Sequence, residues 1–127
     1  MLVETRSPAQ QAQAETVMTK AVVRASEALG LTARALSAVL GVSEASVSRM
    51  RRQDYRLERG TKPFELAVLF IRLFRSLDAI VGGDEAVARA WMSVENSLLG
   101  GRPIDRITSI SGLVDVLAYL DARRALV

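Results

Sequence analysis

The chain has 127 residues, of which half are hydrophobic, and a formal net charge of +3. This is enough apolar material for one compact domain, or for two small segments that share a core. The sequence has no cysteine and no histidine. These absences exclude disulfides, catalytic triads and metal sites built on those side chains, so we expect no cofactor.

The excess positive charge lies in one short stretch of the chain. Residues 1–48 are neutral overall, residues 49–62 carry a net charge of +4, and residues 63–127 carry a net charge of −1. A local basic cluster indicates contact with a polyanion, although an exposed charged turn would give the same pattern.

Nothing in the sequence predicts a membrane segment. The first ten residues lack a basic start followed by an apolar run, so no signal peptide is expected. The most apolar stretch, residues 64–81, is interrupted by four charged side chains, whereas a membrane span needs roughly 20 predominantly apolar residues. We therefore expect a cytoplasmic protein with a buried helix over this stretch.

The first predicted helix runs from Pro8 to about Leu29. Ser7 can cap its start, Gln10 can complete a capping box, and Gly30 ends it. The apolar residues at helical spacing, which we expect to face the core, are Val17, Met18, Ala21, Val22, Ala25, Ala28 and Leu29.

Residues 33–52 have the pattern of a helix-turn-helix. Thr32 can cap a short first helix, Gly41 allows a positive φ in the turn, and Ser43 can cap a second helix that reaches about Arg52. Ser37 supplies the small side chain where the two helices meet. The inner positions are filled by Leu36, Leu40, Val42, Val47 and Met50.

The outward face of the second helix suits DNA. Its small side chains let the helix enter the major groove closely, and Arg49 can pair bidentately with guanine. Arg51, Arg52 and Arg56 are expected to contact phosphates. The candidate DNA-binding residues are Ser43, Glu44, Ala45, Ser46, Ser48, Arg49, Arg51, Arg52 and Arg56.

One alternative structure and one expectation about the oligomeric state follow from this pattern. A plain helical hairpin with a serine-rich surface would show the same inner pattern. The charge is also too small for tight binding by a monomer, so we expect a homodimer or higher oligomer on two half-sites of operator DNA.

The remainder of the chain predicts further helices. A polar loop over residues 54–63 precedes a helix from about Pro63 to Val81, which should be buried on more than one side. A fifth helix follows the cap Asp84, a turn covers residues 96–99, and the last helix spans about Ser111–Arg124. The fifth helix runs through the apolar residues Ala86, Val87, Ala90, Trp91 and Val94. The last helix is expected to face inward through Leu113, Val116, Leu117 and Leu120.

The predicted fold class is therefore all-α, with about six to seven helices. We divide the chain into an N-terminal segment, residues 1–62, with the helix-turn-helix, and a helical segment, residues 63–127. The second segment contains the following residues in order: Ala90, Trp91, Asn96, Leu98, Leu99, Gly101, Pro103, Asp105, Gly112, Val116 and Leu120. In order and spacing, this set resembles the toxin-binding domain of the Xre/MbcA/ParS antitoxin family, and the preceding helix-turn-helix resembles the Xre-like half.

The resemblance implies a protein partner, a RES-domain toxin that attacks NAD or uses it for ADP-ribosylation. In such pairs the C-terminal end of the antitoxin reaches the entrance of the toxin's active site. Relatives end their last helix with a glycine, whereas this chain has Arg123 and Arg124 there, so its helix can continue toward the terminus. The implied toxin-binding residues are Asp121, Arg123, Arg124, Ala125, Leu126 and Val127.

Physical reasoning alone gives the matching residues a structural role. Trp91 is most simply a core anchor, Asn96 caps the turn that follows it, and Gly101 with Pro103 sets the approach to the last helix.

Two other functions remain as alternatives to an antitoxin. A stand-alone helix-turn-helix regulator of transcription would explain residues 33–52 and leave the later pattern as packing. An enzyme based on carboxylates would need a nucleophile, a base and an orienting group, and no such set can be assembled. Asp84, Glu85 and Asp105 lie at expected helix starts, where capping explains them, so we expect no enzyme.

Overall fold

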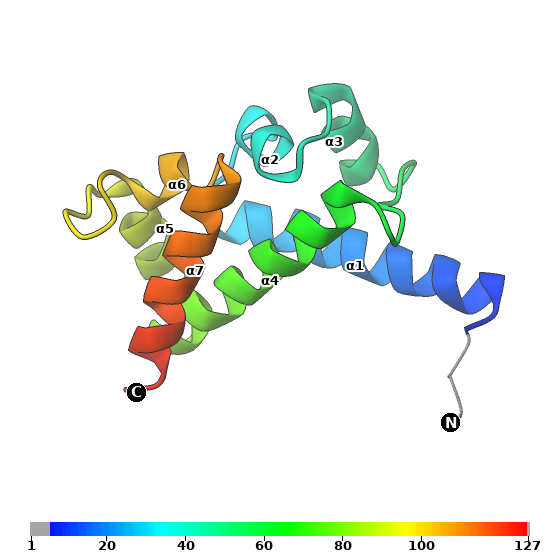
Figure 1. Cartoon of the computed structure of the whole chain (residues 1–127). Helices are drawn as coiled ribbons and strands as arrows, with labels where there is room; N and C mark the ends of the chain where they lie inside the picture. Colours follow the sequence, from blue (N-terminus) through cyan, green and yellow to red (C-terminus); the bar gives the residue numbers. More distant parts are fainter. Residues whose placement is uncertain (1–5, 127) are drawn as a thin grey trace.

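The computed structural model describes residues 6–126, and these form an all-α fold (Figure 1). The helices are α1 (Pro8–Ala28), α2 (Ala33–Leu40), α3 (Glu44–Arg51), α4 (Lys62–Ile80), α5 (Glu85–Ser93), α6 (Pro103–Arg106) and α7 (Ile110–Arg124). Within residues 6–126, β-type pairing is limited to an isolated bridge between Asn96 and Gly101. The predicted fold class is confirmed.

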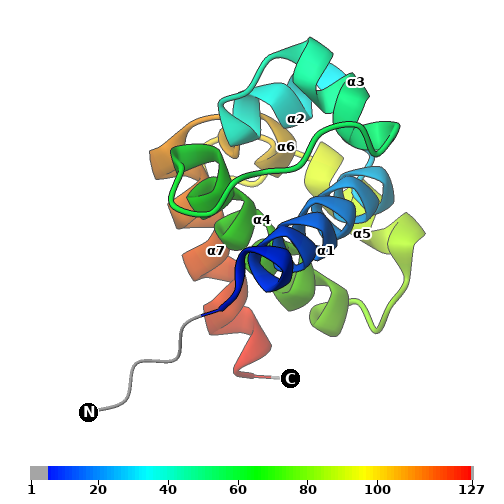
Figure 2. The same cartoon turned by 90° about the vertical axis from the view of Figure 1, so that its right-hand side faces the viewer.

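Helix α4 is the centre of the molecule. It packs against α1 on one side and α7 on another, while α2 crosses it near its start (Figures 1 and 2). The prediction that this helix is buried on more than one side is confirmed by its buried residues, Leu66, Ala67, Phe70, Ile71, Leu73, Ser76 and Leu77. No helix in the described part of the chain has the length and apolar character to cross a membrane.

One hydrophobic core joins the helix-turn-helix to the C-terminal helices. Leu40 and Val47 from the first part belong to the same buried cluster as Phe70, Leu113 and Leu120. Burying one side chain of this size stabilises a fold by about 1.5–3 kcal/mol. The two surfaces described below are therefore supported by shared packing through α4.

The four predicted helix caps are confirmed. Ser7 Oγ accepts a hydrogen bond from the Gln10 N–H at 3.2 Å, and Gln10 Oε1 accepts one from the Ser7 N–H at 2.8 Å, which completes the capping box. Thr32, Ser43 and Asp84 each accept from the backbone N–H three residues later. These side chains satisfy N–H groups that the first turn of a helix leaves unpaired.

The apolar stripe predicted for α1 is wrong in part, and the apolar residues of α5 divide between the core and the surface. Val17 belongs to the apolar stripe of α1, yet it is 62% exposed. In α5 the buried residues are Ala88 and Met92, whereas Val87 and Val94 are exposed. This helix is short and most of its residues are exposed. Its periodicity alone therefore could not show which side would pack.

The approach to the last helix contains a short helix that the sequence did not indicate. Helix α6 follows Arg102, and α7 then begins at Ile110 with Ser109 as its cap, one residue earlier than predicted. A Cβ atom at Gly112 would overlap the main-chain carbonyl of Arg106. Glycine at this position therefore lets α7 pack directly against the end of α6.

Candidate interaction surfaces

The helix-turn-helix has the predicted geometry. Gly41 adopts φ 70°, and its N–H donates to the Ser37 carbonyl at 2.9 Å, which closes α2 before the turn. Four of the five predicted inner residues are buried, and Val42 is partly buried against the core. The outward residues of α3 are exposed, apart from the half-buried Ser48.

Ser46 differs from the other candidate DNA-binding residues because it is only 8% exposed. Its Oγ accepts a hydrogen bond from Ser43 Oγ at 3.0 Å and another from Arg49 Nη2 at 3.3 Å. The Cζ atom of Arg49 also lies 5.8 Å from the ring centroid of Tyr55, within range of a cation–π interaction. Ser46 and Tyr55 therefore hold Arg49 in place on the outward side of α3.

The three arginines expected to contact phosphates lie in different settings. Arg51 turns toward the start of α2, where Nη2 is 3.5 Å from the Leu31 carbonyl. Arg52 Nε lies 3.6 Å from Asp54 Oδ2, and both side chains are largely exposed. This ion pair therefore contributes little to the stability of the fold. Arg56 lies outside α3, in the loop formed by residues 52–61.

That loop is tied to α1 by two side chains that sequence reasoning missed. Glu15 accepts hydrogen bonds from the Arg59 N–H at 2.7 Å and from Arg56 Nε at 3.1 Å. Thr19 Oγ1 accepts one from the Leu57 N–H at 2.9 Å. We call Glu15, Thr19 and these partners the α1 clasp. It fixes the loop beside α3.

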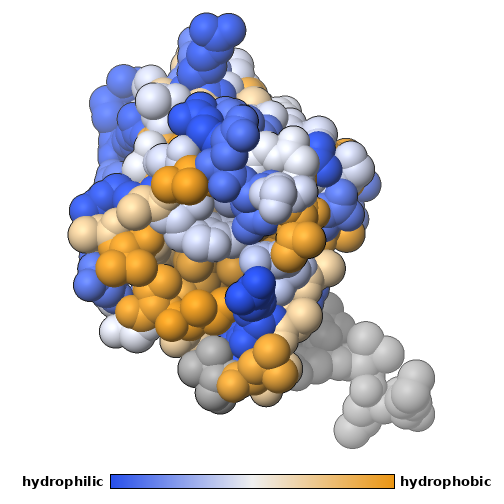
Figure 3. Space-filling view, turned by 90° about the vertical axis from the view of Figure 1, so that its left-hand side faces the viewer, coloured by the Kyte–Doolittle hydropathy of each residue, from blue (hydrophilic) through white to orange (hydrophobic). Residues whose placement is uncertain are grey.

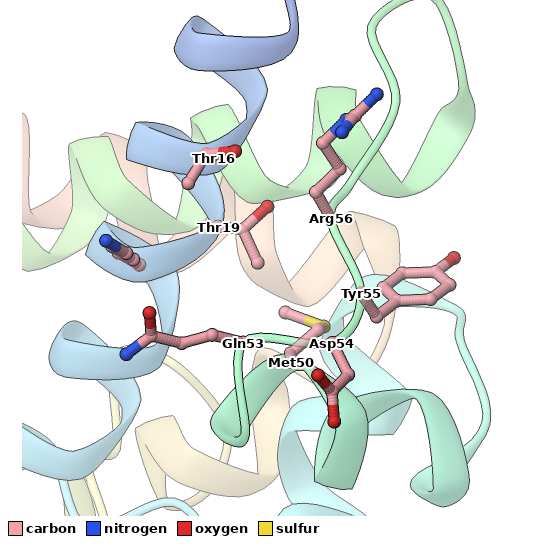
Figure 4. Close-up of a pocket in the computed structure, with 8 residues that line it drawn as sticks. Thr16, Thr19, Met50, Gln53, Asp54, Tyr55 and Arg56 are labelled. Carbon is pink, nitrogen blue, oxygen red and sulfur yellow. The ribbon is translucent and has the colours of Figure 1, made fainter.

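The environment of Glu15 favours its charged form. The Arg59 N–H lowers the pKa of Glu15, and the hydrogen bond and charge of Arg56 act in the same direction, against the effect of burial. Figure 4 shows Thr16 and Thr19 of α1 across an open pocket from Tyr55 and Arg56. No local sequence signal marks the clasp, because its partners are more than 35 residues apart.

A second surface lies on α5 and α7. Trp91 is half-buried and stacks on Tyr119, with ring centroids 6.1 Å apart and an interplanar angle of 23°. The Cζ atom of Arg123 lies 4.8 Å from the centroid of the same tyrosine. We call Trp91, Tyr119 and Arg123 the aromatic row. The interpretation of Trp91 as a core anchor is wrong in part, because Ala88 and Met92 carry the fully buried contacts of α5.

The residues implied to bind a toxin lie at the end of α7 but do not act as one group. Asp121 Oδ1 accepts from Ser76 Oγ at 2.6 Å, and Oδ2 accepts from Arg72 Nη2 at 3.4 Å, so this side chain attaches α7 to α4. Arg123 and Arg124 form the last turn of α7, Ala125 is its C-cap, and Leu126 is 86% exposed. Val127 lies outside the described residues.

Two of the three acidic residues considered for catalysis have structural partners. Asp84 caps α5, and Asp105 accepts two hydrogen bonds from Arg102, at 2.8 and 3.1 Å. Among residues 6–126, no cluster of three acidic side chains is placed to hold a metal ion.

Comparison with known families gives two matches that together span most of the chain. Residues 8–72 match the model of the antitoxin Xre-like helix-turn-helix domain. Residues 76–125 match the model of the antitoxin Xre/MbcA/ParS C-terminal toxin-binding domain. Among curated proteins, no match was found. The first match includes α1–α3 and the start of α4, and the second includes α5–α7 with the aromatic row.

Proposed function

Because this chain belongs to the Xre-type antitoxins, with a helix-turn-helix domain followed by a toxin-binding domain, we propose that it neutralises a RES-domain, NAD-consuming toxin. We further propose that it represses its own operon by binding operator DNA. In this proposal residues 1–62 bind DNA, and residues 63–127 bind the toxin and mediate oligomer formation. The protein would act in the cytoplasm by binding alone, without catalysis.

The exposed end of α7 is the observation that carries the toxin-binding half of the proposal. Arg124, Ala125 and Leu126 extend beyond the packed part of the helix, and Leu126 exposes nearly all of its apolar side chain. A terminal segment of this kind becomes ordered when it docks in a partner. The entrance of the toxin's active site would bury Leu126 and bring Arg124 close to the site where NAD phosphates bind.

The outward face of α3 supports the DNA-binding half. Arg49 is held by Ser46 and Tyr55 before any DNA is present, so less side-chain entropy is lost when it pairs with a guanine. Arg52 adjoins this face, where a phosphate would replace its exposed pairing with Asp54. Two copies of the chain would place two such helices in successive turns of the major groove.

Co-expression with the neighbouring RES-domain toxin tests the proposal. We expect the full chain to restore growth and to co-purify with the toxin in a fixed ratio. An Arg49→Ala variant, which changes only the DNA-binding face, should restore growth equally well.

Continued growth arrest in the presence of soluble, folded protein would contradict neutralisation. It would leave the alternative of a stand-alone regulator of transcription, which the intact helix-turn-helix supports.

A further inference from the structure

Trp91 and Tyr119 of the aromatic row pack against the core but remain partly exposed. Trp91 is the single tryptophan of the chain, and it lies half-buried although Ala88 and Met92 already attach α5 to the core. A large aromatic ring at the surface retains much apolar area that only a partner can bury. The part of the Trp91 ring that remains exposed is therefore available to a partner.

The three side chains of the row already interact in the free chain. The Tyr119 ring stacks on Trp91, and the Arg123 guanidinium lies over the same Tyr119 ring. Tryptophan, tyrosine and arginine are the residue types that most often dominate the binding energy of protein interfaces. Because the three side chains already support one another, less conformational entropy is lost when they are buried.

Further exposed apolar residues lie on the elements that carry the row. Val87, one helical turn before Trp91, is 49% exposed, and Arg123 leads along α7 to the exposed Leu126. Figure 3 views the molecule from the side where α5, α6 and α7 lie, and it shows apolar residues gathered in the lower half of that face, with hydrophilic residues mainly above them. All three residues of the row fall within the segment that matches a toxin-binding domain.

We infer that the aromatic row is the main anchor for the toxin, at a site separate from the toxin's active-site entrance. Trp91 enters an apolar pocket on the toxin surface, Tyr119 supports the ring from behind, and Arg123 pairs with a carboxylate at the edge of that pocket. This inference rests on the proposed function, because it requires that the chain binds a toxin. It adds a contact surface that begins at α5 and continues to the end of α7.

Fluorine NMR of the chain labelled with 5-fluorotryptophan tests the inference directly, since the label reports on Trp91 alone. Addition of unlabelled toxin should shift the resonance and protect it from solvent.

In matched titrations Trp91→Ala should weaken toxin binding by at least about 30-fold, whereas Trp91→Phe should recover most of the loss. Val94→Ala, an exposed change just beyond α5, should alter the affinity less than about threefold.

The possible outcomes separate the inference from the proposed function. A toxin that binds tightly but leaves the fluorine resonance unchanged would overturn the inference and leave the antitoxin function intact. A resonance that depends on the concentration of the chain without toxin would also overturn it, because the row would then contact a second copy. If the wild-type chain binds no toxin, the proposed function fails and the inference fails with it.

Discussion

The two surfaces of this molecule are built in opposite ways. On α3 the apolar side chains of Val47 and Met50 are fully used in the core, and what remains outside is small, polar or basic. On α5 and α7 the core is completed by other residues, and a tryptophan and a tyrosine remain partly outside. A surface that reads DNA needs charged side chains that neighbouring residues keep in position. A surface that binds a protein needs apolar area that stays exposed in the folded chain.

The strongest test of this comparison asks whether the two surfaces share one core. Leu73 lies fully buried in α4, between the two regions. Leu73→Ala should lower the free energy of unfolding by about 2–5 kcal/mol and weaken both regions together. Urea denaturation followed by circular dichroism and by Trp91 fluorescence should give coincident transitions.

The control for this change is Arg75→Ala, an exposed position on the same helix, which should alter stability by less than about 0.5 kcal/mol. Two separate transitions in the Leu73→Ala variant would show that the regions fold independently.

A smaller effect should distinguish base readout from phosphate contact on α3. Arg49→Ala should reduce discrimination among operator sequences by about 1–3 kcal/mol, because a bidentate pair with guanine is lost. Arg52→Ala should instead weaken binding to all sequences alike and reduce the slope of affinity against salt by about one. Competition assays with altered operators measure both. An equal loss on every sequence for Arg49→Ala would argue against its readout role.

Removal of the chain end should affect only the other surface. Deletion of Leu126 and Val127 should reduce toxin affinity by about tenfold, as expected for the burial of one leucine side chain. Operator binding and the melting temperature should not change, since the side chain of Leu126 is exposed in the free protein. Full protection of cells at limiting expression would contradict an inserted tail.

The smallest expected effect concerns the α1 clasp. The pKa of Glu15 is lowered from its ordinary value of 4.5. Its charged form therefore stabilises the folded state above about pH 4.5, and this contribution is lost as the pH falls through the lowered pKa. Glu15→Gln should be slightly less stable than the wild type at pH 7, and the difference should shrink in acid.

Thermal unfolding of both proteins between pH 3 and pH 7 measures this difference. This range includes the ordinary pKa of a glutamate, about 4.3–4.5. A constant difference across the range would show that the charge of Glu15 does not contribute to the clasp.

The same contrast explains which features could be predicted from the sequence. Caps such as Ser7 and Ser43, and the turn at Gly41, depend on contacts within a few residues, so their local patterns are sufficient. The α1 clasp joins Glu15 to Arg59 across the fold, and nothing near either residue reveals it. Trp91 could be recognised as important, but its half-exposed position depends on how α5 packs, which its short pattern left ambiguous.

Hydrogen–deuterium exchange of the chain with and without the toxin tests whether α5 and α7 bind the toxin, because it locates the binding surface without any mutation. We expect protection in α5 and in the last turns of α7, with little change in α2 and α3. Protection confined to α2 and α3, with α5 and α7 unchanged, would contradict the assignment of the toxin to the C-terminal surface.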